Sequence, residues 1–355
     1  MTPIQPTIKG RGAAHNPPNR FEPVAFEIDG DFLDGEERPA PRTQYFKDSA
    51  RSIIVANDSP DVGFTHSINV YRGCAHGCCY CYARPTHEYL GLSAGLDFET
   101  KIFVKEKAPE LLRQEMQRAK WAPVMLAMSG VTDCYQPIER QLKLTRRCLQ
   151  VLAEFRNPVG IVTKSHLVTR DIDVLQELAS YSAAVVLVSI TTLDASLSAK
   201  MEPRAASPSR RLAAVKALAE AGVPVGIMVA PVVPGLTDHE IPAILQAAAD
   251  AGAQWAGYTT LRLPGAVAEL FAGWAADHYP DRRDKILNRV RELRGGKLND
   301  PRFGSRMRGA GVFADQFSAV FKLAKRRAGL NKPFPELSLD AFRRPLRDGE
   351  QLTLF

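Results

Sequence analysis

The stretch SINVYRGCAHGCCYCYARP (residues 67–85) joins a short β-strand pattern directly to a cysteine-rich loop. Cys74, Cys78 and Cys81 have the spacing C-x3-C-x2-C, which places three thiols within eight residues. Clustered thiolates are soft ligands, and they suit zinc or an iron–sulfur cluster. A four-iron cluster held by three cysteines keeps one iron without a protein ligand, and that open position is useful in catalysis. The spacing therefore predicts a metal centre with a chemical function.

Two other uses of these cysteines stay open from the residues alone. Structural zinc ordinarily takes four protein ligands in two separated pairs. Here only Cys79 or His76 is near enough in sequence to complete such a set. A disulfide needs an oxidising compartment, whereas the N-terminal residues 1–21 lack the apolar core of a secretory signal. We therefore expect reduced thiols and a cytoplasmic protein.

Outward from this loop, the chain alternates between short apolar strands and helix-like stretches. The strand patterns are SINVYRG (67–73), PVMLAMSG (123–130), VGIVTKS (159–165), AAVVLVSI (183–190), PVGIMVAP (224–231) and QWAGYTTLRLP (254–264). In residues 139–155, 209–222 and 238–252, apolar residues recur at spacings of three and four, which is typical of helices. We expect Gly222 and Gly252 to end the second and third of these helices with a left-handed cap.

Continuous apolar strands with helical crossovers predict an α/β protein in which helices cover a parallel sheet. We expect a partial (β/α)6 barrel over residues 61–280. An extended N-terminal arm (1–60) precedes it, and a basic helical C-terminal region (281–347) and a short tail (348–355) follow. In such folds the functional residues gather where the carboxyl ends of the strands meet their loops.

The cysteine loop after the first strand, with aromatic Tyr80 just before the last thiol, resembles that of the radical S-adenosylmethionine superfamily. The resemblance covers about residues 65–280 and implies a barrel of that superfamily's type. It implies that Cys74, Cys78 and Cys81 bind a [4Fe–4S] cluster whose open iron chelates S-adenosylmethionine. Electron transfer would then cleave this cofactor to a 5′-deoxyadenosyl radical, which takes hydrogen from the substrate. By the same resemblance Tyr80 lies against the adenine, and a reductant such as flavodoxin or ferredoxin supplies electrons.

Further segments narrow the resemblance to the branch of spore photoproduct lyase and uncharacterised proteins called DNA repair photolyases. These segments are SGVTDCYQPIE (129–139), TKSHLVTRDIDVL (163–175), SITTLD (189–194), EPRAASPSRR (202–211) and PVVPGLTD (231–238). The branch implies a lyase-like reaction on damaged DNA.

The end of the second strand is where superfamily members hold the amino group of the cofactor, commonly with a Gly-Gly-Glu motif. Here the position reads Ser129-Gly130-Val131-Thr132-Asp133, so the match is one of position only. Asp133 can accept from the ammonium group, and the small Ser129-Gly130 pair permits a close backbone approach. The structural alternative is that Asp133 caps the following helix.

The next strands contribute further candidates for cofactor contacts. Lys164 and Ser165 end the third strand and Ser189 ends the fourth, with their donors facing the same mouth. Arg204 is our choice for the cofactor carboxylate, because a guanidinium offers two parallel donors. Arg210 and Arg211 compete for this role.

Spore photoproduct lyase returns a hydrogen atom to its product radical from a cysteine near the end of the second strand. In this chain the nearest candidate is Cys134, which is slightly displaced from that place. We take Cys134 as the candidate catalytic residue. Its displacement puts the lyase activity itself in question.

Positive charge is concentrated near the C-terminus. The chain has a formal net charge of +7, and residues 281–347 hold 18 Lys and Arg against 7 Asp and Glu. Such a region can bind a phosphate backbone by Coulomb attraction and counterion release, or it can simply be a solvated surface. We expect it to bind nucleic acid, with DNA favoured.

The chain ends in Gln351-Leu352-Thr353-Leu354-Phe355. This ending resembles the short peptide by which bacterial replication and repair proteins bind the DNA sliding clamp. A hydrogen-bonding Gln and an apolar plug form a plausible groove-binding unit. The alternative is an apolar terminus that folds back on the barrel.

The function predicted from these observations is radical chemistry on a DNA lesion. The alternatives are radical modification of RNA or a protein, and a non-enzymatic iron–sulfur module associated with DNA or the clamp. The missing fourth ligand favours the enzyme, because a structural cluster is best held by four protein ligands. No apolar run reaches membrane-spanning length, so no membrane partner is expected.

Overall fold

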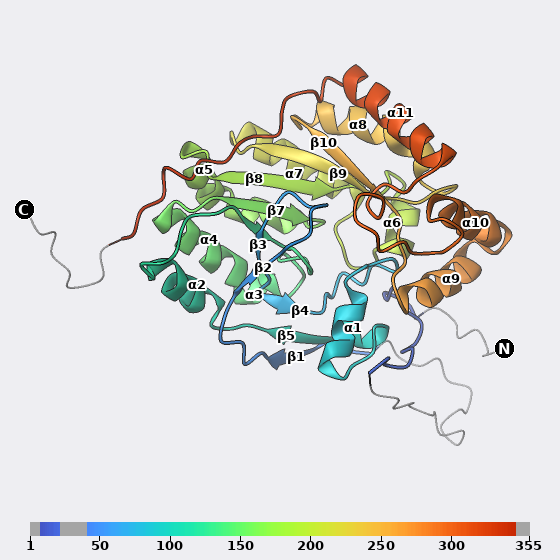
Figure 1. Cartoon of the computed structure of the whole chain (residues 1–355), viewed down its shortest axis with the longest axis horizontal. Coiled ribbons are helices and arrows are strands. Elements are labelled where there is room, and N and C mark those ends of the chain that lie inside the picture. Colours follow the sequence, from blue (N-terminus) through green and yellow to red (C-terminus); the bar gives the residue numbers. More distant parts are fainter. Residues whose placement is uncertain (1–7, 22–40, 346–355) are drawn as a thin grey trace, which may run out of the picture.

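Seven strands form the central sheet of the protein, in the order β10-β9-β8-β7-β6-β3-β2. The computed structural model describes residues 8–21 and 41–345 (Figure 1). Six neighbouring strands run parallel: β3 (His66–Ile68), β6 (Leu126–Met128), β7 (Val159–Thr163), β8 (Ala184–Ser189), β9 (Val225–Val232) and β10 (Ala256–Thr260). The edge strand β2 (Ile54–Ala56) pairs antiparallel with β3. The predicted partial (β/α)6 barrel is therefore confirmed.

These strands form where the sequence has β-branched and small apolar residues, and helices such as α5 (Ile172–Ser180), α7 (Pro208–Glu220) and α8 (Ile241–Asp250) pack on the sheet. In β8, five of the six residues of AVVLVS are buried. The covering helices also include α2 (Ala108–Gln117) and α4 (Leu144–Phe155). The predicted glycine caps are present, with φ of 72° at Gly222 and 93° at Gly252.

The helix predicted over residues 139–155 is interrupted. It consists of α3 (Glu139–Leu142) and α4, and Lys143 between them has φ of 52°. The buried Glu139 carboxylate accepts from the Thr145 backbone N–H at 3.1 Å, so a side chain pins the break. Apolar periodicity continues across the break, which is why the pattern alone does not reveal it.

The first predicted strand is also divided between two sheets. Residues after Ile68 leave the main sheet, and β4 (Tyr71–Arg72) joins a small sheet of order β1-β5-β4 with β1 (Gln44–Lys47) and β5 (Lys101–Val104). The turn into this second sheet brings the cysteine loop over the carboxyl ends of the parallel strands. Short helices η2 (Arg84–Leu90) and α1 (Leu96–Thr100) return the chain to β5.

The C-terminal region packs beside β10. Helices α9 (Val267–His278) and α10 (Arg283–Leu293) pack on each other, and α11 (Val312–Arg327) packs on α8. Residues 331–345 then run back across the molecule as an extended strap that bonds to Ser182 and Phe155 backbone oxygens (Figure 1). The predicted tail, Gln351–Phe355, lies outside the described residues. The remaining short helices are η3 (His166–Asp171), α6 (Ala195–Met201), η4 (Asp238–Glu240) and η5 (Pro280–Arg282).

Part of the predicted N-terminal arm is integrated into this fold. Strands β1 and β2 each take a place in a sheet, and residues 11–13 are buried. In the described part of the chain no helix is long and apolar enough to cross a membrane.

Candidate active site

The three predicted ligand cysteines lie on the loop that follows β4. Cys74 and Cys78 are buried, Cys81 is partly exposed, and all three are free thiols. Burial raises the pKa of the Cys78 thiol well above its usual range, and Cys81 and Cys74 raise it further because they lie close by. Burial and Cys74 likewise raise the pKa of Cys81. The loop thus gathers three thiols in one electrostatically coupled group.

The chemistry of this donor set suits an iron–sulfur cluster, which cysteine thiolates hold. Lys164 lowers the pKa of both Cys78 and Cys81, which favours the thiolate form that iron requires.

Buried polar side chains brace the loop from beneath. The Arg84 guanidinium is fully buried, donates to the Cys78 carbonyl at 3.0 Å and pairs with Glu99 at 2.6 Å. Gln136 accepts from the Ala75 N–H at 2.9 Å and donates to a loop carbonyl. Because these partners come from separate segments, tertiary packing and not local sequence fixes the loop.

The N-terminal segment 8–21 lies directly on the cysteine loop. A Cβ atom on Gly12 would come 1.6 Å from the Gly77 carbonyl oxygen, so only glycine allows this approach. The Gly12 N–H donates to Glu99 Oε2 at 3.1 Å, and Gly77 itself has φ of 67°. Segment 8–21 is therefore part of the wall around the cysteines, a role that its composition did not predict.

Tyr80 points into a buried polar network. Its hydroxyl donates to the Glu202 carboxylate and lies 3.2 Å from Thr191 Oγ1. Glu202 also pairs with the buried Arg211. Burial alone would raise the pKa of Glu202, but Arg211, Lys164 and the Tyr80 hydroxyl outweigh it and lower the pKa to about 2. Tyr80 is thus held by a charged acid, and the Lys164 ammonium lies 5.8 Å from its ring centroid.

At the end of β6, the Ser129-Gly130 pair makes a tight turn. Ser129 has φ of 76°, and its hydroxyl accepts from the Cys134 N–H at 2.9 Å. A Cβ atom on Gly130 would lie 2.9 Å from Ser67 Cβ. The turn therefore depends on a small residue at 130, as expected for a place of close approach.

Asp133 has a full set of partners. It accepts from the Lys164 N–H at 2.7 Å, from Thr163 Oγ1 at 2.8 Å and from the Tyr135 N–H at 2.9 Å, and it pairs with His76 at 3.4 Å. Burial raises the pKa of Asp133, but His76 and the N–H donors lower it to about 2. Asp133 does not cap α3, which begins later. It ties the ends of β6 and β7 to the cysteine loop.

Ser165 and Ser189 occupy different situations. Ser165 caps η3, because its hydroxyl accepts from the Leu167 N–H at 3.2 Å. Ser189 is buried at the carboxyl end of β8, and its carbonyl accepts from Arg211 Nη1 at 3.1 Å. The Ser165 hydroxyl is therefore used as a helix cap, whereas Ser189 lies at the carboxyl end of β8, at the mouth of the barrel.

The three candidate arginines are separated by the fold. Arg211 is only 1% exposed and is committed to Glu202. Arg204 donates to Thr43 Oγ1 at 3.1 Å, and Arg210 Nη2 lies 3.3 Å from His166 Nδ1. Arg204 and Arg210 line a pocket that contains neither Tyr80 nor Lys164. The cation beside Tyr80 is therefore Lys164 and not Arg204.

Cys134, the candidate hydrogen-atom donor, is 2% exposed and belongs to the main hydrophobic core together with Cys148. Its carbonyl accepts from Thr145 Oγ1 at 2.6 Å. Burial raises the pKa of this thiol well above its usual range. Cys134, which is displaced in the sequence from the place of the hydrogen-donating cysteine, therefore lies in the hydrophobic core.

Sequence reasoning missed an exposed aromatic residue beside the cysteines. Tyr82 directly follows Cys81, is 46% exposed and donates to the Gly130 carbonyl at 3.0 Å. The Arg262 guanidinium lies 4.8 Å from the Tyr82 ring centroid. An aromatic residue next to the last thiol was a signal for this position, but only the fold shows that Arg262 covers it.

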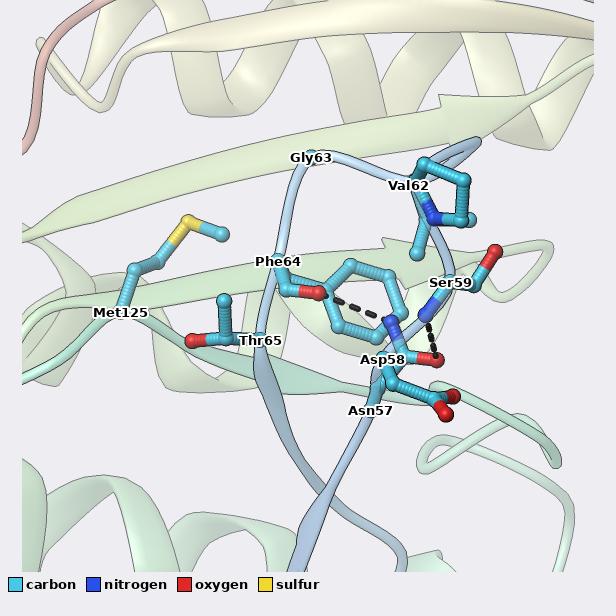
Figure 2. A pocket seen from close by; sticks show the side chains of 9 residues that line it. Asn57, Asp58, Ser59, Val62, Gly63, Phe64, Thr65 and Met125 are labelled. Atoms are coloured by element: carbon cyan, nitrogen blue, oxygen red, sulfur yellow. Dashed lines mark hydrogen bonds between the residues drawn. The ribbon is translucent and has the colours of Figure 1, made fainter. Parts of the chain in front are cut away.

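A second hollow lies away from the predicted site residues. It has a volume of about 450 Å³ and is lined by residues 57–60 and 62–65 together with Met125. Figure 2 shows this loop crossing in front of the sheet, where Asn57 donates to the Phe64 carbonyl at 2.9 Å. Asp61 in the same loop pairs with Arg306. The loop and the C-terminal region are thus tied together on one side of the barrel.

Comparisons with known proteins agree with this architecture. The family model described as the radical SAM superfamily matches residues 68–248. An uncharacterised protein of Mycobacterium tuberculosis is 36% identical over 248 residues, which are 69% of this chain and 72% of the relative. An uncharacterised protein of Methanocaldococcus jannaschii is 33% identical over 178 residues, 50% of this chain and 64% of the relative.

Solved structures with the same fold include spore photoproduct lyase complexed with dinucleoside spore photoproduct. The TM-score is 0.56 at 17% identity, with 76% of each chain covered. Another is a spore photoproduct lyase mutant with bound AdoMet and dinucleoside spore photoproduct, with a TM-score of 0.58 at 16% identity, covering 82% of this chain and 85% of that one. At such identities the similarity shows the fold.

Proposed function

Because the chain belongs to the radical S-adenosylmethionine superfamily, we propose that it is a radical enzyme acting on nucleic acid, with a lyase-like repair of damaged DNA as the first candidate. Enzymes of this superfamily use a [4Fe–4S] cluster and S-adenosylmethionine. When bound, these groups supply a 5′-deoxyadenosyl radical, formed by reductive cleavage of the sulfonium, that takes a hydrogen atom from the substrate.

In this proposal Cys74, Cys78 and Cys81 hold the cluster. The support is the burial of Cys74 and Cys78, the proximity of the three thiols and the neighbouring Lys164 ammonium. Segment 8–21 and the Arg84–Glu99 pair keep the loop in place and exclude water from one side of it. Exclusion of water strengthens every electrostatic interaction in such a site.

The residues around Tyr80 are the proposed cofactor contacts. The Tyr80 ring offers an aromatic face whose position the Glu202 carboxylate fixes through the hydroxyl. Lys164 presents a cation to that face and is well placed for a carboxylate. Ser129 and Gly130 give close backbone access at the end of β6, and Ser189 lies at the end of β8. Asp133 acts through the strand ends that it joins.

The observation that carries the nucleic-acid substrate is the exposed Tyr82 beside Cys81, with Arg262 over its ring. Bases stack on exposed aromatic side chains, and arginines bind the adjoining phosphates. Burial lowers the pKa of Arg262, and the neighbouring Arg306, which pairs with Asp61, lowers it further. Arg306 belongs to the basic C-terminal region, which thereby reaches the mouth of the barrel.

The core position of Cys134 weighs against a direct role in returning hydrogen to the substrate. Replacing Cys134 by Ala tests this: a variant that still completes turnover assigns the hydrogen donor elsewhere. The sliding clamp, as a partner of Gln351–Phe355, and flavodoxin or ferredoxin, as reductants, stay proposals that rest on sequence alone.

The deciding experiment is anaerobic reconstitution followed by measurement of 5′-deoxyadenosine in the presence of a reductant. We expect formation to rise when ultraviolet-irradiated DNA is added, and not with undamaged DNA. Cofactor cleavage that responds only to RNA or to a protein would overturn the DNA substrate while keeping the radical enzyme. A reconstituted protein that carries a cluster but never cleaves S-adenosylmethionine would favour the non-enzymatic module.

A further inference from the structure

A pocket of about 470 Å³ lies on the outer side of the cysteine loop. Its lining comes from four separate segments of the chain, which contribute His76, Arg140, Ser165, His166, Arg204 and Arg210. The remaining lining residues are small, apolar or aromatic, and none of the lining residues is acidic. A pocket with three guanidinium groups and no carboxylate has the chemistry of an anion site.

The cations of this pocket converge. Arg210 Nη2 lies 3.3 Å from His166 Nδ1. Burial lowers the pKa of His166, and the charges of Arg210 and Arg140, which line the same pocket, lower it further. Arg204 lines the same pocket from the segment before α7. All three arginines therefore line one pocket, in which Arg140 and Arg210 are exposed and Arg204 also donates to Thr43 Oγ1.

Neighbouring arginines contrast with these three. Arg146 pairs with Asp171 and Asp173, and Arg170 pairs with Glu139 and Asp171. Within residues 8–21 and 41–345, no carboxylate forms an ion pair with the three pocket arginines. Like charges held together without a counterion repel one another, and a bound polyanion removes that cost.

This pocket is distinct from the proposed cofactor face. Successive residues of a strand end point to opposite sides, so Lys164 faces Tyr80 while Ser165 lines the outer pocket. The pocket contains none of Cys74, Cys78, Cys81 and Tyr80. His76 links the two sides, since it belongs to the cysteine loop and pairs with Asp133.

We propose that the pocket formed by Arg140, His166, Arg204 and Arg210 binds a phosphate group. Guanidinium groups match the geometry of phosphate oxygens through paired donors. The phosphate can come from a nucleic-acid backbone or from a free phosphate compound. Only the first source rests on the proposed function, in which it would hold the strand beside the cysteine loop.

The test compares two double variants of the reconstituted full chain. Arg204→Ala with Arg210→Ala removes two pocket cations. Arg147→Ala with Lys216→Ala removes two surface cations that pair with Glu110 and Glu220, so the change in net charge is the same. The probes are inorganic pyrophosphate, measured by calorimetry, and a short undamaged DNA duplex, measured by fluorescence anisotropy at several salt concentrations.

We expect the pocket variant to lose at least about ten-fold in affinity for pyrophosphate, since each charge-assisted contact is worth that much. If the phosphate belongs to a nucleic-acid backbone, the slope of log duplex affinity against log salt concentration also falls by about two. A loss confined to pyrophosphate supports the pocket with a free phosphate compound as its ligand. The control variant should leave the pyrophosphate affinity unchanged and weaken duplex binding only slightly.

Three results overturn the site: no pyrophosphate or duplex binding by the wild type, equal losses in both double variants, or weaker S-adenosylmethionine binding with unchanged phosphate binding. The last would assign Arg204 to the cofactor carboxylate after all. The iron–sulfur absorbance checks that each variant remains intact. Because the phosphate measurement needs no turnover, failure of the proposed reaction, read as absent 5′-deoxyadenosine, is separate from failure of this site.

Discussion

The cysteine loop and the basic C-terminal region both stand out in the amino-acid composition. In the folded protein, however, only the loop keeps its distinctive residues together. In the loop, the thiols that stand out in the sequence stay together, with Cys74 and Cys78 buried and Cys81 partly exposed. In the described part of the basic C-terminal region, residues 281–345, the cations have different structural roles. Arg294 is buried and donates to carbonyls on two segments, Arg306 ties down the loop at Asp61, and Lys322 on α11 is exposed. Spacing within one loop survives folding, whereas a charge count does not say which charges face solvent.

The largest effect should come from the loop. Replacing Cys74, Cys78 or Cys81 by Ala is expected to abolish both the iron–sulfur absorbance and the formation of 5′-deoxyadenosine, because three ligands are the minimum for the cluster. Iron content and product formation after anaerobic reconstitution are the measurements.

Cys148→Ala is the matched control, since Cys148 is a buried thiol on α4, away from the cysteine loop. It should keep the full iron content. A Cys74→Ala protein that still binds stoichiometric iron would show that the loop is not the metal site.

The next effect concerns the support beneath the loop. Arg84→Ala leaves the buried Glu99 carboxylate without its partner, and we expect a loss of about 3–5 kcal/mol in the free energy of unfolding. Urea denaturation measures it. Lys216→Ala removes a pair in which both side chains are 66% exposed, and it should cost no more than about 0.5 kcal/mol. If both variants lose the same free energy of unfolding, the buried Arg84–Glu99 pair contributes no more to stability than an exposed ion pair.

Two sets of variants sharpen the division within the basic region. Arg294→Ala removes several buried charge-assisted hydrogen bonds and should lower the free energy of unfolding by more than about 2 kcal/mol. Lys322→Ala with Arg326→Ala removes two exposed cations of α11, and its stability should stay within about 0.5 kcal/mol.

The Lys322→Ala, Arg326→Ala double variant should instead reduce the slope of log affinity for DNA against log salt concentration by up to about two. Fluorescence anisotropy against salt concentration measures this slope. If the slope is unchanged, the charges of α11 serve solubility, and the arginines at the barrel mouth must account for DNA affinity.

The smallest effect on stability is expected at the tail. Deleting Gln351–Phe355 should leave cluster content and melting temperature nearly unchanged and should eliminate binding to the bacterial sliding clamp. The reason is that a short peptide plug concentrates its affinity in a few apolar anchors. A truncation that lowers the melting temperature, together with a wild type that ignores the clamp, would indicate a tail packed on the barrel.

The sequence by itself determined the parallel sheet and the thiol group. Six apolar β-branched runs separated by helical periods leave few alternatives to a parallel α/β fold, and three cysteines within eight residues cannot be moved far apart by any fold. Tyr80 could be singled out for the same reason, since its neighbour Cys81 fixes its position along the chain. The resemblance to the superfamily rested on these local features.

Tertiary structure alone decided which charged side chains serve the site. Glu202 pairs with Arg211 next to Tyr80. Asp133 binds His76 and the end of β7. Arg204 lines the outer pocket. The sequence offers Asp133, Arg204 and Arg211 as candidate cofactor contacts, but it does not show which partner each of them takes. Burial and pairing depend on segments far apart in the chain, and the direction of a side chain at a strand end depends on a register that only the folded sheet fixes.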